Sequence, residues 1–338
     1  MTTGHASATG NVLRRTAIVG TGAYVPAKVM TNFDIEKIVD TTDEWIVTRS
    51  GIRERRIAAE NEATSDMATI AAQRAMAMAG VTPDTIDQII VATLTPDMGF
   101  PNTACFVQSR LGARNAHCFD LEAACSGFLY GIDVARHFIA TGAAETSLVI
   151  GAEKLSTVTD WQDRATCVLF GDGAGAAVVR PAVHGRGIIG SIMASDGTLN
   201  ELLTLPGGGS RNPASHQTID ARMHYMKMNG KEVFKHAVRM MTDVSRQVLA
   251  KCNLTINDID CIIPHQANMR ILQAIAERLG LGLDRFYVNL EKYGNMSAAS
   301  VPVALDEAVQ SGRVKRGDLV LMVAFGGGFT WGATVMEW

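Results

Sequence analysis

The stretch Ile86-Asp87-Gln88-Ile89-Ile90 and its near copy Ile259-Asp260-Cys261-Ile262-Ile263 decide the fold. Each is an apolar run of strand length, and such runs alternate along the chain with longer helical patterns. This alternation predicts an α/β protein with buried strands. Two further pairs of segments repeat in the same order, residues 119–122 with 288–291 and residues 147–151 with 318–322. The shared order favours a duplicated domain over chance similarity between two α/β units.

The repeat divides the chain into two halves of similar length. We place the boundary near residues 181–186, which gives an N-terminal half at residues 13–183 and a C-terminal half at residues 184–338. Residues 1–12 are small and polar, and we predict that they form a disordered tail. Duplication of this kind lets equivalent strand ends from both halves converge on one central site.

The local patterns predict individual helices and strands. Gly80 and Gly142 are predicted to end the first two helices, since glycine favours the left-handed conformation found there. Residues 205–215 contain three consecutive glycines and predict a surface loop. Strands are predicted at residues 16–20, 88–93, 117–121, 148–151, 261–263, 287–290 and 319–324, and helices at residues 65–79, 128–140, 230–252 and 268–279.

Composition excludes several classes of protein. The 338 residues are 47% hydrophobic, which is enough for a large core, and the net charge of −3 provides no basic field for nucleic acid. The six cysteines form no Cys-x-x-Cys pair and no zinc-finger spacing, so no metal site is expected. The N-terminal residues lack the apolar segment of a signal peptide, and no apolar run is long enough for a membrane span. These features indicate a cytoplasmic protein with reduced thiols.

Cys125 is the candidate nucleophile. It follows the predicted strand 117–121 after a short turn and directly precedes the apolar helix 128–140. Free backbone N–H groups and the helix dipole at such a position favour thiolate over thiol. Small neighbours at residues 123, 124, 126 and 127 would let a substrate approach. A buried inert thiol is the usual role of cysteine, and we assign it to the other five.

His265 is the second candidate, at the end of the predicted strand 261–263. That rim of an α/β sheet is where ligands bind. A structural histidine that caps the helix 268–279 is the alternative. Gln266 and Asn268 add polar groups at the same rim, which favours a functional role.

Asn295 is the third candidate, in a turn after the predicted strand 287–290. Gly-Asn is also an ordinary turn dipeptide. What favours function is its place in the duplication, which we interpret as opposite Cys125. A carboxamide is not a base, but its NH₂ group can donate to a carbonyl oxygen that becomes an enolate.

Glycine-rich segments have different interpretations. The glycines at residues 326–328 follow a predicted strand, and the N–H groups of Gly327 and Cys125 could form an oxyanion hole. Residues 20–22 lack the third glycine of a dinucleotide fingerprint, and residues 170–175 lack the lysine of a phosphate loop. We interpret residues 170–175 as closely packed structural backbone near the site.

Together these segments resemble the β-ketoacyl-acyl carrier protein synthase III family, the thiolase-superfamily condensing enzymes that start bacterial type II fatty acid synthesis. The resemblance covers nearly all of residues 12–338. The set Cys/His/Asn separates this family from elongating synthases, which have Cys/His/His. The segments that carry it are residues 31–34, 43–46 with Arg49 and 51–52, 123–128, 169–176, 264–268, 293–295 and 325–329.

The resemblance implies a thiolase-like α/β fold with duplicated halves in a five-layered αβαβα arrangement, and a homodimer. It implies a decarboxylative Claisen condensation of acyl-CoA, with acetyl-CoA the expected primer, and malonyl-acyl carrier protein. The product would be a 3-oxoacyl-carrier protein. No metal or other cofactor is implied, and acyl-CoA is a substrate.

The resemblance also implies roles for substrate-binding residues. Trp45 and Arg164 would clamp the adenine of coenzyme A, and Arg49 would meet a phosphate. Asn268 would bind the pantetheine arm. Phe100 would reach across a dimer to close the acyl pocket of the partner subunit.

A basic patch is expected to receive the acidic carrier protein. On the helix 230–252, Lys235 lies on the outer face, and Arg270 begins the helix that follows His265. A positive patch at the entrance would steer the carrier towards the site. Gln266 is assigned to the same contact, whereas Lys231 is interpreted as an ordinary solvated side chain.

Several alternatives remain open at this point. A polyketide-type synthase shares Cys/His/Asn, and a hydroxymethylglutaryl-CoA synthase would need a glutamate base, for which Glu122 is nearby but unmarked. A cysteine hydrolase would use Cys125 and His265 as nucleophile and base, with Asn295 as the orienting residue. A binding protein without activity is disfavoured by the intact set of reactive residues.

Overall fold

Two β-sheets form the frame of the protein. The computed structural model describes residues 13–183 and 187–338, so the tail predicted at residues 1–12 lies outside the described residues. The N-terminal sheet has the order β1-β7-β6-β4-β5, and the C-terminal sheet has the order β11-β12-β13-β8. The strands of the first sheet are β1 Thr16–Tyr24, β4 Gln88–Ala92, β5 His117–Leu121, β6 Ser147–Glu153 and β7 Gly173–Pro181. Those of the second are β8 Gly187–Ser195, β11 Cys261–Pro264, β12 Leu319–Gly326 and β13 Thr330–Glu337.

The two sheets share one topology, which supports the predicted duplication. Strand β1 corresponds to β8, β7 to β13, β6 to β12 and β4 to β11. The counterpart of β5 is the one predicted strand that is wrong. Residues 287–290 form no strand, because pairing there is limited to a single parallel bridge between Ile262 and Phe286. The helix α10 Leu290–Tyr293 begins at once.

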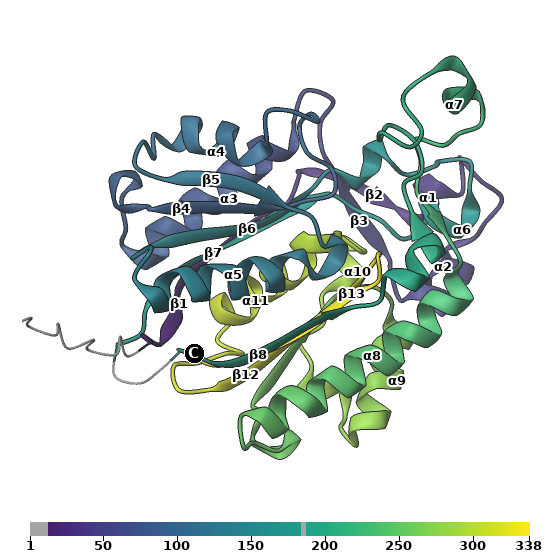
Figure 1. Ribbon diagram of the computed structural model, residues 1–338. Coiled ribbons are helices and arrows are strands. Elements are labelled where there is room, and N and C mark those ends of the chain that lie inside the picture. The colour runs from purple at the N-terminus through teal and green to yellow at the C-terminus, as the bar shows by residue number, and fades with distance from the viewer. Residues whose placement is uncertain (1–12, 184–186) are drawn as a thin grey trace, which may run out of the picture.

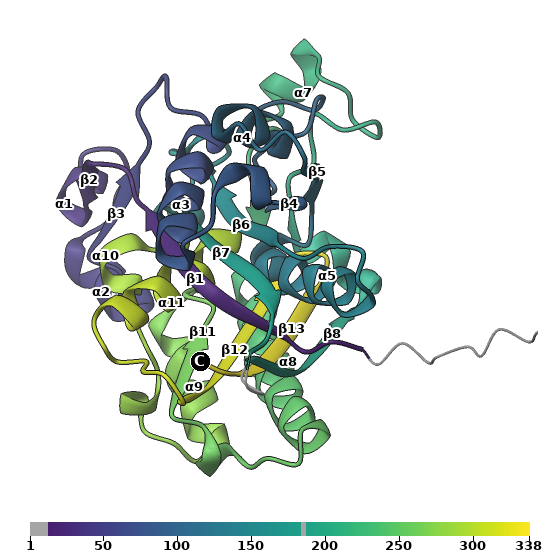
Figure 2. The same ribbon diagram turned by 90° about the vertical axis from the view of Figure 1, so that its left-hand side faces the viewer.

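Helices separate and cover the sheets in five layers (Figures 1 and 2). Helices α3 and α4 cover the outer face of the N-terminal sheet, and α8 and α9 cover that of the C-terminal sheet. Helices α5 and α11 lie between the two sheets. The order is therefore αβαβα, as the resemblance implied. The bounds are α3 Thr64–Ala79, α4 Thr103–Leu111, α5 Gly127–Thr141, α8 Gly230–Lys251, α9 Met269–Leu279 and α11 Ser300–Gln310.

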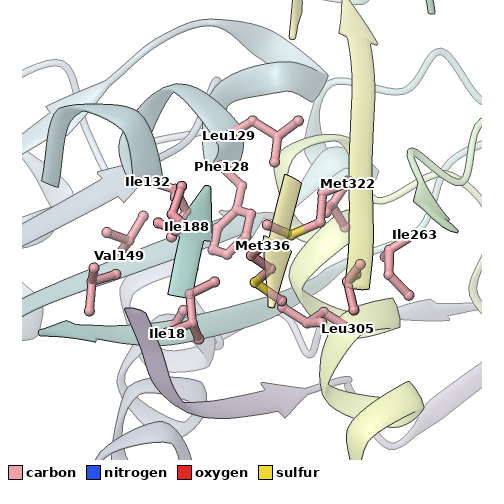
Figure 3. Close-up of a cluster of buried hydrophobic side chains, with 14 of the residues drawn as sticks. Ile18, Phe128, Leu129, Ile132, Val149, Ile188, Ile263, Leu305, Met322 and Met336 are labelled. Carbon is pink, nitrogen blue, oxygen red and sulfur yellow. The ribbon is translucent and has the colours of Figure 1, made fainter. Parts of the chain in front are cut away.

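The largest buried cluster joins both sheets through the middle helix layer (Figure 3). Ile18 and Val149 come from the N-terminal sheet, Phe128 comes from α5, and Met322 and Met336 come from the C-terminal sheet. Because the same side chains belong to both halves, the halves form one continuous core, and their shared face is rigidly packed.

Glycines confirm two sequence interpretations. Gly80 and Gly142 end α3 and α5 with φ of 64° and 82°, as predicted. Gly20 and Gly22 lie inside β1, where an added Cβ would be 2.5 Å from the carbonyl oxygen of Ala75 and 2.4 Å from that of Ala71. These two glycines therefore lie within a strand that approaches the backbone of α3, and not in the turn of a dinucleotide fingerprint.

Each half carries a short 3₁₀ turn before its central helix. These turns are η2 Ala124–Ser126 before α5 and η7 Ser297–Ala299 before α11. Ala124 and Ser297 both have φ of 45°, an uncommon conformation for residues other than glycine. The structure therefore pairs Ala124 with Ser297, so Ala298 is opposite Cys125. The predicted alignment of Asn295 with Cys125 is wrong, because Asn295 precedes its turn.

Smaller elements surround the ends of the central helices. The pair β2 Lys28–Thr31 and β3 Glu54–Ile57 lies with the helices α1 Asn32–Ile35, α2 Asp43–Ser50 and α6 Arg164–Cys167 on one side (Figure 1). An excursion after β8 contains β9 Leu203–Thr204, α7 His216–Asp220 and β10 Lys227–Met228, and its residues 205–215 form the predicted loop. In the described parts of the chain, no helix is both long and apolar enough to cross a membrane.

Candidate active site

A cavity of about 960 Å³ opens where the two halves meet. Its wall includes Cys125, His265 and Asn295, together with the glycines at residues 326–328. The three candidate side chains therefore share one chamber although they are far apart in the sequence. Apolar residues from the N-terminal half line another part of the wall, among them Leu94, Leu155 and Phe170.

Cys125 lies in η2, at the N-terminal end of α5, where the sequence placed it. The turn is stabilised by hydrogen bonds within it: Ser126 Oγ donates to the carbonyl of Ala123 at 2.8 Å, and Glu122 Oε1 accepts from Ala124 N–H at 2.9 Å. The thiol itself is buried. The backbone thus presents a single sulfur at the floor of the cavity.

The protonation of Cys125 differs from the expectation based on the helix dipole. Burial raises the pKa of the Cys125 thiol to about 12, and hydrogen bonding from Ser297 lowers it only in part. The nearby charge of Glu153 raises this pKa further. The backbone N–H of Cys125 lowers this pKa, as the sequence predicted, but desolvation outweighs it, so the thiol keeps its proton around pH 7. Another group must accept the thiol proton when the sulfur attacks.

His265 follows β11 and is held by its own backbone, since its N–H donates to the carbonyl of Val323 at 2.7 Å. Its imidazole is buried, and Nδ1 has no hydrogen-bond partner in the described structure. Burial lowers the pKa of His265 to about 3. The ring is therefore neutral around pH 7, and can donate a hydrogen bond without carrying charge.

Asn295 is fixed by the segment before β7. Its N–H donates to Leu169 O at 2.8 Å, and its carbonyl accepts from Gly171 N–H at 3.0 Å. Its side-chain Oδ1 accepts from Ser297 N–H at 2.8 Å. Because the oxygen end of the amide is engaged, the NH₂ end is left to donate into the cavity. The segment 170–175 is thus structural, as interpreted from the sequence, and its role is to position Asn295.

The candidate oxyanion hole joins η2 to the turn between β12 and β13. An added Cβ at Gly326 would lie 2.6 Å from the backbone nitrogen of Cys125. The backbone of β12 therefore passes directly against the nucleophile, and Gly327 follows at the cavity wall. This contact brings the two predicted N–H donors, those of Cys125 and Gly327, onto adjoining segments.

Gly326→Ala is expected to slow acylation of Cys125 by about 10²-fold, since a misplacement of about 1 Å can have that effect. The added methyl group must push η2 away from β12. Stopped-flow release of coenzyme A measures the rate. Gly197→Ala is the matched control, since an added Cβ there meets nothing within 4 Å. Equal rates for the two variants would show that the β12 contact does not position Cys125.

The residues predicted to bind coenzyme A lie near the cavity mouth. Trp45 and Arg49 line it, and the guanidinium groups of Arg49 and Arg164 each lie 4.8 Å from the centre of the Trp45 ring. Arg164 also donates to the carbonyl of Asp40 at 2.9 Å and borders a neighbouring depression instead of the main cavity. An adenine between Trp45 and Arg164 would have to displace that guanidinium.

Asn268 lies at the cavity wall, whereas Phe100 lies outside it. Asn268 lines the cavity and caps α9, with Oδ1 accepting from Arg270 N–H at 2.9 Å and Nδ2 donating to Arg49 O at 3.0 Å. A pantetheine contact would therefore compete with an existing hydrogen bond. Phe100 lies outside the cavity wall and is 89% exposed, on the loop between β4 and α4.

The basic residues differ in their distance from the mouth. Arg270 lines the cavity, with its guanidinium 5.9 Å from the ring centre of Phe234. Lys231 also borders the cavity, and it is exposed, in agreement with its interpretation as a solvated residue. Lys235 lies away from the wall and pairs with Glu232 at 3.7 Å.

The prediction that Gln266 contacts the carrier protein is wrong. Its side chain is 1% exposed. Nε2 donates to the carbonyls of Pro264 and Tyr287 at 2.9 and 3.1 Å, and Oε1 accepts from Asn289 N–H at 3.1 Å. A side chain enclosed by three backbone partners cannot reach another protein. Gln266 instead ties β11 to the segment that leads to Asn295.

Sequence reasoning missed two residues beside the nucleophile. Ser297 lines the cavity, and Glu153 is buried behind it in β6. Glu153 could have been noticed in the sequence, because it ends an apolar strand and a buried carboxylate needs a specific environment. Over residues 13–183 and 187–338, no group of three or more His, Cys, Asp and Glu side chains could hold a metal ion.

The fold and this set of residues define a condensing enzyme of the thiolase class. A family model described as 3-oxoacyl-[acyl-carrier-protein] synthase III matches residues 119–197, and the model of its C-terminal part matches residues 249–338. The β-ketoacyl-[acyl-carrier-protein] synthase III of Caldanaerobacter subterraneus subsp. tengcongensis is 56% identical over 321 residues, which cover 95% of this chain and 97% of that protein. The chain therefore belongs to the β-ketoacyl-[acyl-carrier-protein] synthase III family.

Solved structures agree with this assignment. The 3-oxoacyl-[acyl-carrier-protein] synthase III from Aquifex aeolicus VF5 has a TM-score of 0.89 at 51% identity, with coverage of 96% of this chain and 100% of that one. The priming β-ketosynthase of the R1128 polyketide pathway has a TM-score of 0.90 at 35% identity, with coverage of 98% of both chains. The same fold and similar sequences thus occur in a 3-oxoacyl-[acyl-carrier-protein] synthase III and in a priming ketosynthase of a polyketide pathway.

Proposed function

We propose that the protein catalyses the decarboxylative condensation of an acyl-CoA with malonyl-acyl carrier protein, the reaction that initiates type II fatty acid synthesis. Membership of the synthase III family supports this reaction. The observation that carries it is the shared cavity, in which a buried thiol faces two neutral hydrogen-bond donors, His265 and Asn295.

In the first half of the reaction, the Cys125 sulfur attacks the thioester carbon of acyl-CoA. The N–H groups of Cys125 and Gly327 stabilise the oxyanion that forms, and removal of one such donor typically costs about 2.7–4 kcal/mol. Coenzyme A leaves, and the acyl group remains on the enzyme as a thioester.

In the second half, malonyl-carrier protein enters the same cavity. His265 and Asn295 donate hydrogen bonds to its thioester oxygen, so that loss of CO₂ leaves an enolate stabilised by both. The enolate carbon attacks the acyl carbonyl, a carbon–carbon bond forms, and the Cys125 sulfur is released. The product is a 3-oxoacyl-carrier protein.

The environment of His265 favours this scheme over a cysteine hydrolase. A hydrolase would require His265 to take the thiol proton, but burial lowers the pKa of His265 to about 3. A donor to an enolate must instead be neutral and preorganised, which suits both His265 and Asn295.

The proposed function is tested with malonyl-carrier protein and a series of primers. We expect CO₂ release and a 3-oxoacyl product with acetyl-CoA, with slower turnover of isobutyryl- and octanoyl-CoA. Hydrolysis of acyl-CoA without CO₂ release would indicate the hydrolase. A faster reaction with longer primers would keep the condensation but overturn acetyl-CoA as the primer.

Further parts of the proposal follow the family. We infer a homodimer, because β5 is an edge strand of its sheet and the loop nearby exposes Met98 and Phe100. A second copy could cover this edge and place Phe100 at the partner's acyl pocket. We also propose that the enzyme works in the cytoplasm without a metal or redox cofactor. Arg270 and Lys231 at the cavity mouth, with Lys235 nearby, would receive the acidic carrier.

Trp45→Ala is expected to raise the KM for acetyl-CoA about tenfold with little change in kcat. Stacking of one base on an aromatic ring contributes about 1–3 kcal/mol, and 1.4 kcal/mol is a factor of ten. Steady-state kinetics measure the effect. The N-acetylcysteamine thioester of acetate lacks the adenine, so its KM should stay unchanged in the variant. An equal rise for both substrates would contradict a role of Trp45 in binding adenine.

A further inference from the structure

Glu153 is a fully buried carboxylate to which the condensation scheme assigns no task. It lies near the end of β6, and every donor described around it is neutral. Thr95 Oγ1 donates to Oε2 at 2.5 Å, and Thr93 Oγ1 donates at 3.2 Å. The N–H groups of Leu94 and Thr95 donate at 3.2 Å as well. These contacts fix the carboxylate in position without neutralising its charge.

Ser297 begins η7, the turn that packs both against β6, which carries Glu153, and against η2, which carries Cys125. The nearby Ser297 hydroxyl lowers the pKa values of both the Cys125 thiol and the Glu153 carboxyl. Ser297 Oγ is itself buried and has no hydrogen-bond partner in the described structure. Ser297 Oγ is therefore a buried, unpartnered hydroxyl in a turn that contacts both the strand of Glu153 and the turn of Cys125.

The backbone of Ser297 is in a conformation that normally selects glycine. Its φ is 45°, and its N–H is held by Asn295 Oδ1 at 2.8 Å. A non-glycine residue in this region costs free energy, and such strain often marks functional positions. Glycine would relieve the strain, but it would remove the hydroxyl. The presence of serine instead of glycine at this position therefore indicates a function for the hydroxyl.

The two halves are packed so that η7 lies against the strand of Glu153. Gly151 and Glu153 lie on the same face of β6, since alternate strand residues share a face. An added Cβ at Gly151 would lie 2.2 Å from the carbonyl oxygen of Ala298. Because Gly151 has no side chain, η7 lies directly on the strand that carries Glu153.

Protonation equilibria agree with this geometry. Burial raises the pKa of Glu153 to about 7, whereas burial lowers that of His265 to about 3. Around pH 7, Glu153 can thus take up a proton that His265 cannot. The other charged group near the thiol is Glu122, on the segment before η2, whose negative charge also raises the pKa of Cys125.

We propose that the Cys125 thiol loses its proton to Glu153 through the hydroxyl of Ser297. The S–H bond breaks as Ser297 Oγ takes that proton, and the Ser297 O–H bond breaks as Glu153 takes the other. The sulfur electron pair attacks the thioester carbon. The departing coenzyme A thiolate takes up the proton when the carbon–sulfur bond breaks, so Glu153 is ionised again. This step rests on the proposed function. It moves the negative charge from Glu153 to the Cys125 sulfur and creates no second negative charge.

The test uses alkylation of Cys125 by iodoacetamide in the full-length protein, followed by mass spectrometry of the Cys125 peptide. In the wild type, the rate should rise with pH to a plateau above about 7, as Glu153 ionises. In Ser297→Ala it should fall about 10²-fold, the size of a general-base contribution, and lose the plateau. Glu153→Gln should lose the inflection near pH 7.

A purely structural role of Ser297 would produce a different result. In that case Ser297→Ala would react more slowly but keep the wild-type pH profile, and this outcome would overturn the proposal, as would an unchanged rate. Ser297→Gly relieves the backbone strain, so it should be at least as stable as the wild type and still react slowly. Ser245→Ala, which removes a buried hydroxyl in α8 that donates to Met241 O, should react as the wild type does.

Two further features of the design keep the outcomes distinct. Glu153→Gln places an NH₂ group against four N–H and O–H donors and could fail to fold, in which case Ser297→Ala and Ser297→Gly decide the matter. Alkylation requires neither acyl-CoA nor a carrier protein. If the pH profile follows the proton route but no condensation occurs, the proposed function fails while the route from Cys125 to Glu153 stands.

Discussion

Cys125→Ser is expected to lose condensing activity by a factor on the order of 10⁴ or more, because a serine hydroxyl is a far weaker nucleophile than a thiolate. The cavity offers little help to the hydroxyl, since His265 is neutral with a pKa of about 3. Serine has nearly the same shape, so the fold should be preserved. The rate of 3-oxoacyl-carrier formation from acetyl-CoA and malonyl-carrier protein measures the loss.

The same variant should still decarboxylate malonyl-carrier protein, because His265 and Asn295 remain in place. Cys261→Ser is the matched control, since Cys261 is a fully buried thiol in β11 that does not line the cavity. It should lose stability but keep its rate per folded molecule. Comparable losses of condensation in the two variants would indicate that buried thiols matter here for packing alone.

His265→Ala and Asn295→Ala are expected to show the opposite pattern. Each removes one neutral donor to the enolate, so decarboxylation should slow by about 10²–10³-fold per variant, which corresponds to about 2.7–4 kcal/mol. Transfer of the acyl group from acetyl-CoA to Cys125 should remain, since the donors of the oxyanion hole are backbone groups. Release of CO₂ and of coenzyme A, measured separately, distinguishes the two halves of the reaction.

Gln266→Ala provides the control for this pair. Gln266 is adjacent to His265, but it is enclosed by backbone hydrogen bonds and lies outside the cavity wall. Its loss should lower the stability of the C-terminal half and affect both half-reactions alike. If His265→Ala also slowed both halves equally, the assignment of His265 to the enolate would be wrong.

The sequence was sufficient to predict the architecture and the three candidate residues. The repeated Ile-Asp dipeptide and the apolar run after each copy predicted two similar halves. The two sheets have matching strand orders, in agreement with this prediction. The sequence pointed to Cys125, His265 and Asn295 because each follows a predicted strand or lies in a turn after one, where α/β proteins bind ligands. In the structure, all three side chains line one cavity. Their catalytic roles stay predictions until variants are measured.

What the sequence did not show depends on burial and on contacts between segments that are separated in the chain. The role of Gln266 was mistaken because its enclosure comes from Tyr287 and Asn289, distant segments that fold over it. The balance at Cys125 was mistaken because a helix dipole is visible in sequence, whereas the depth of burial is not. The neighbourhood of Glu153 and Ser297 arises only when η7 packs on β6.

The most direct test of the central claim is the fate of an isotope-labelled acetyl group. The protein is incubated with labelled acetyl-CoA, digested, and analysed by mass spectrometry before and after addition of malonyl-carrier protein. We predict label on the Cys125 peptide alone, and its complete transfer to the 3-oxoacyl product when the malonyl substrate arrives. Label elsewhere, or label on Cys125 that malonyl-carrier protein does not remove, would contradict the account.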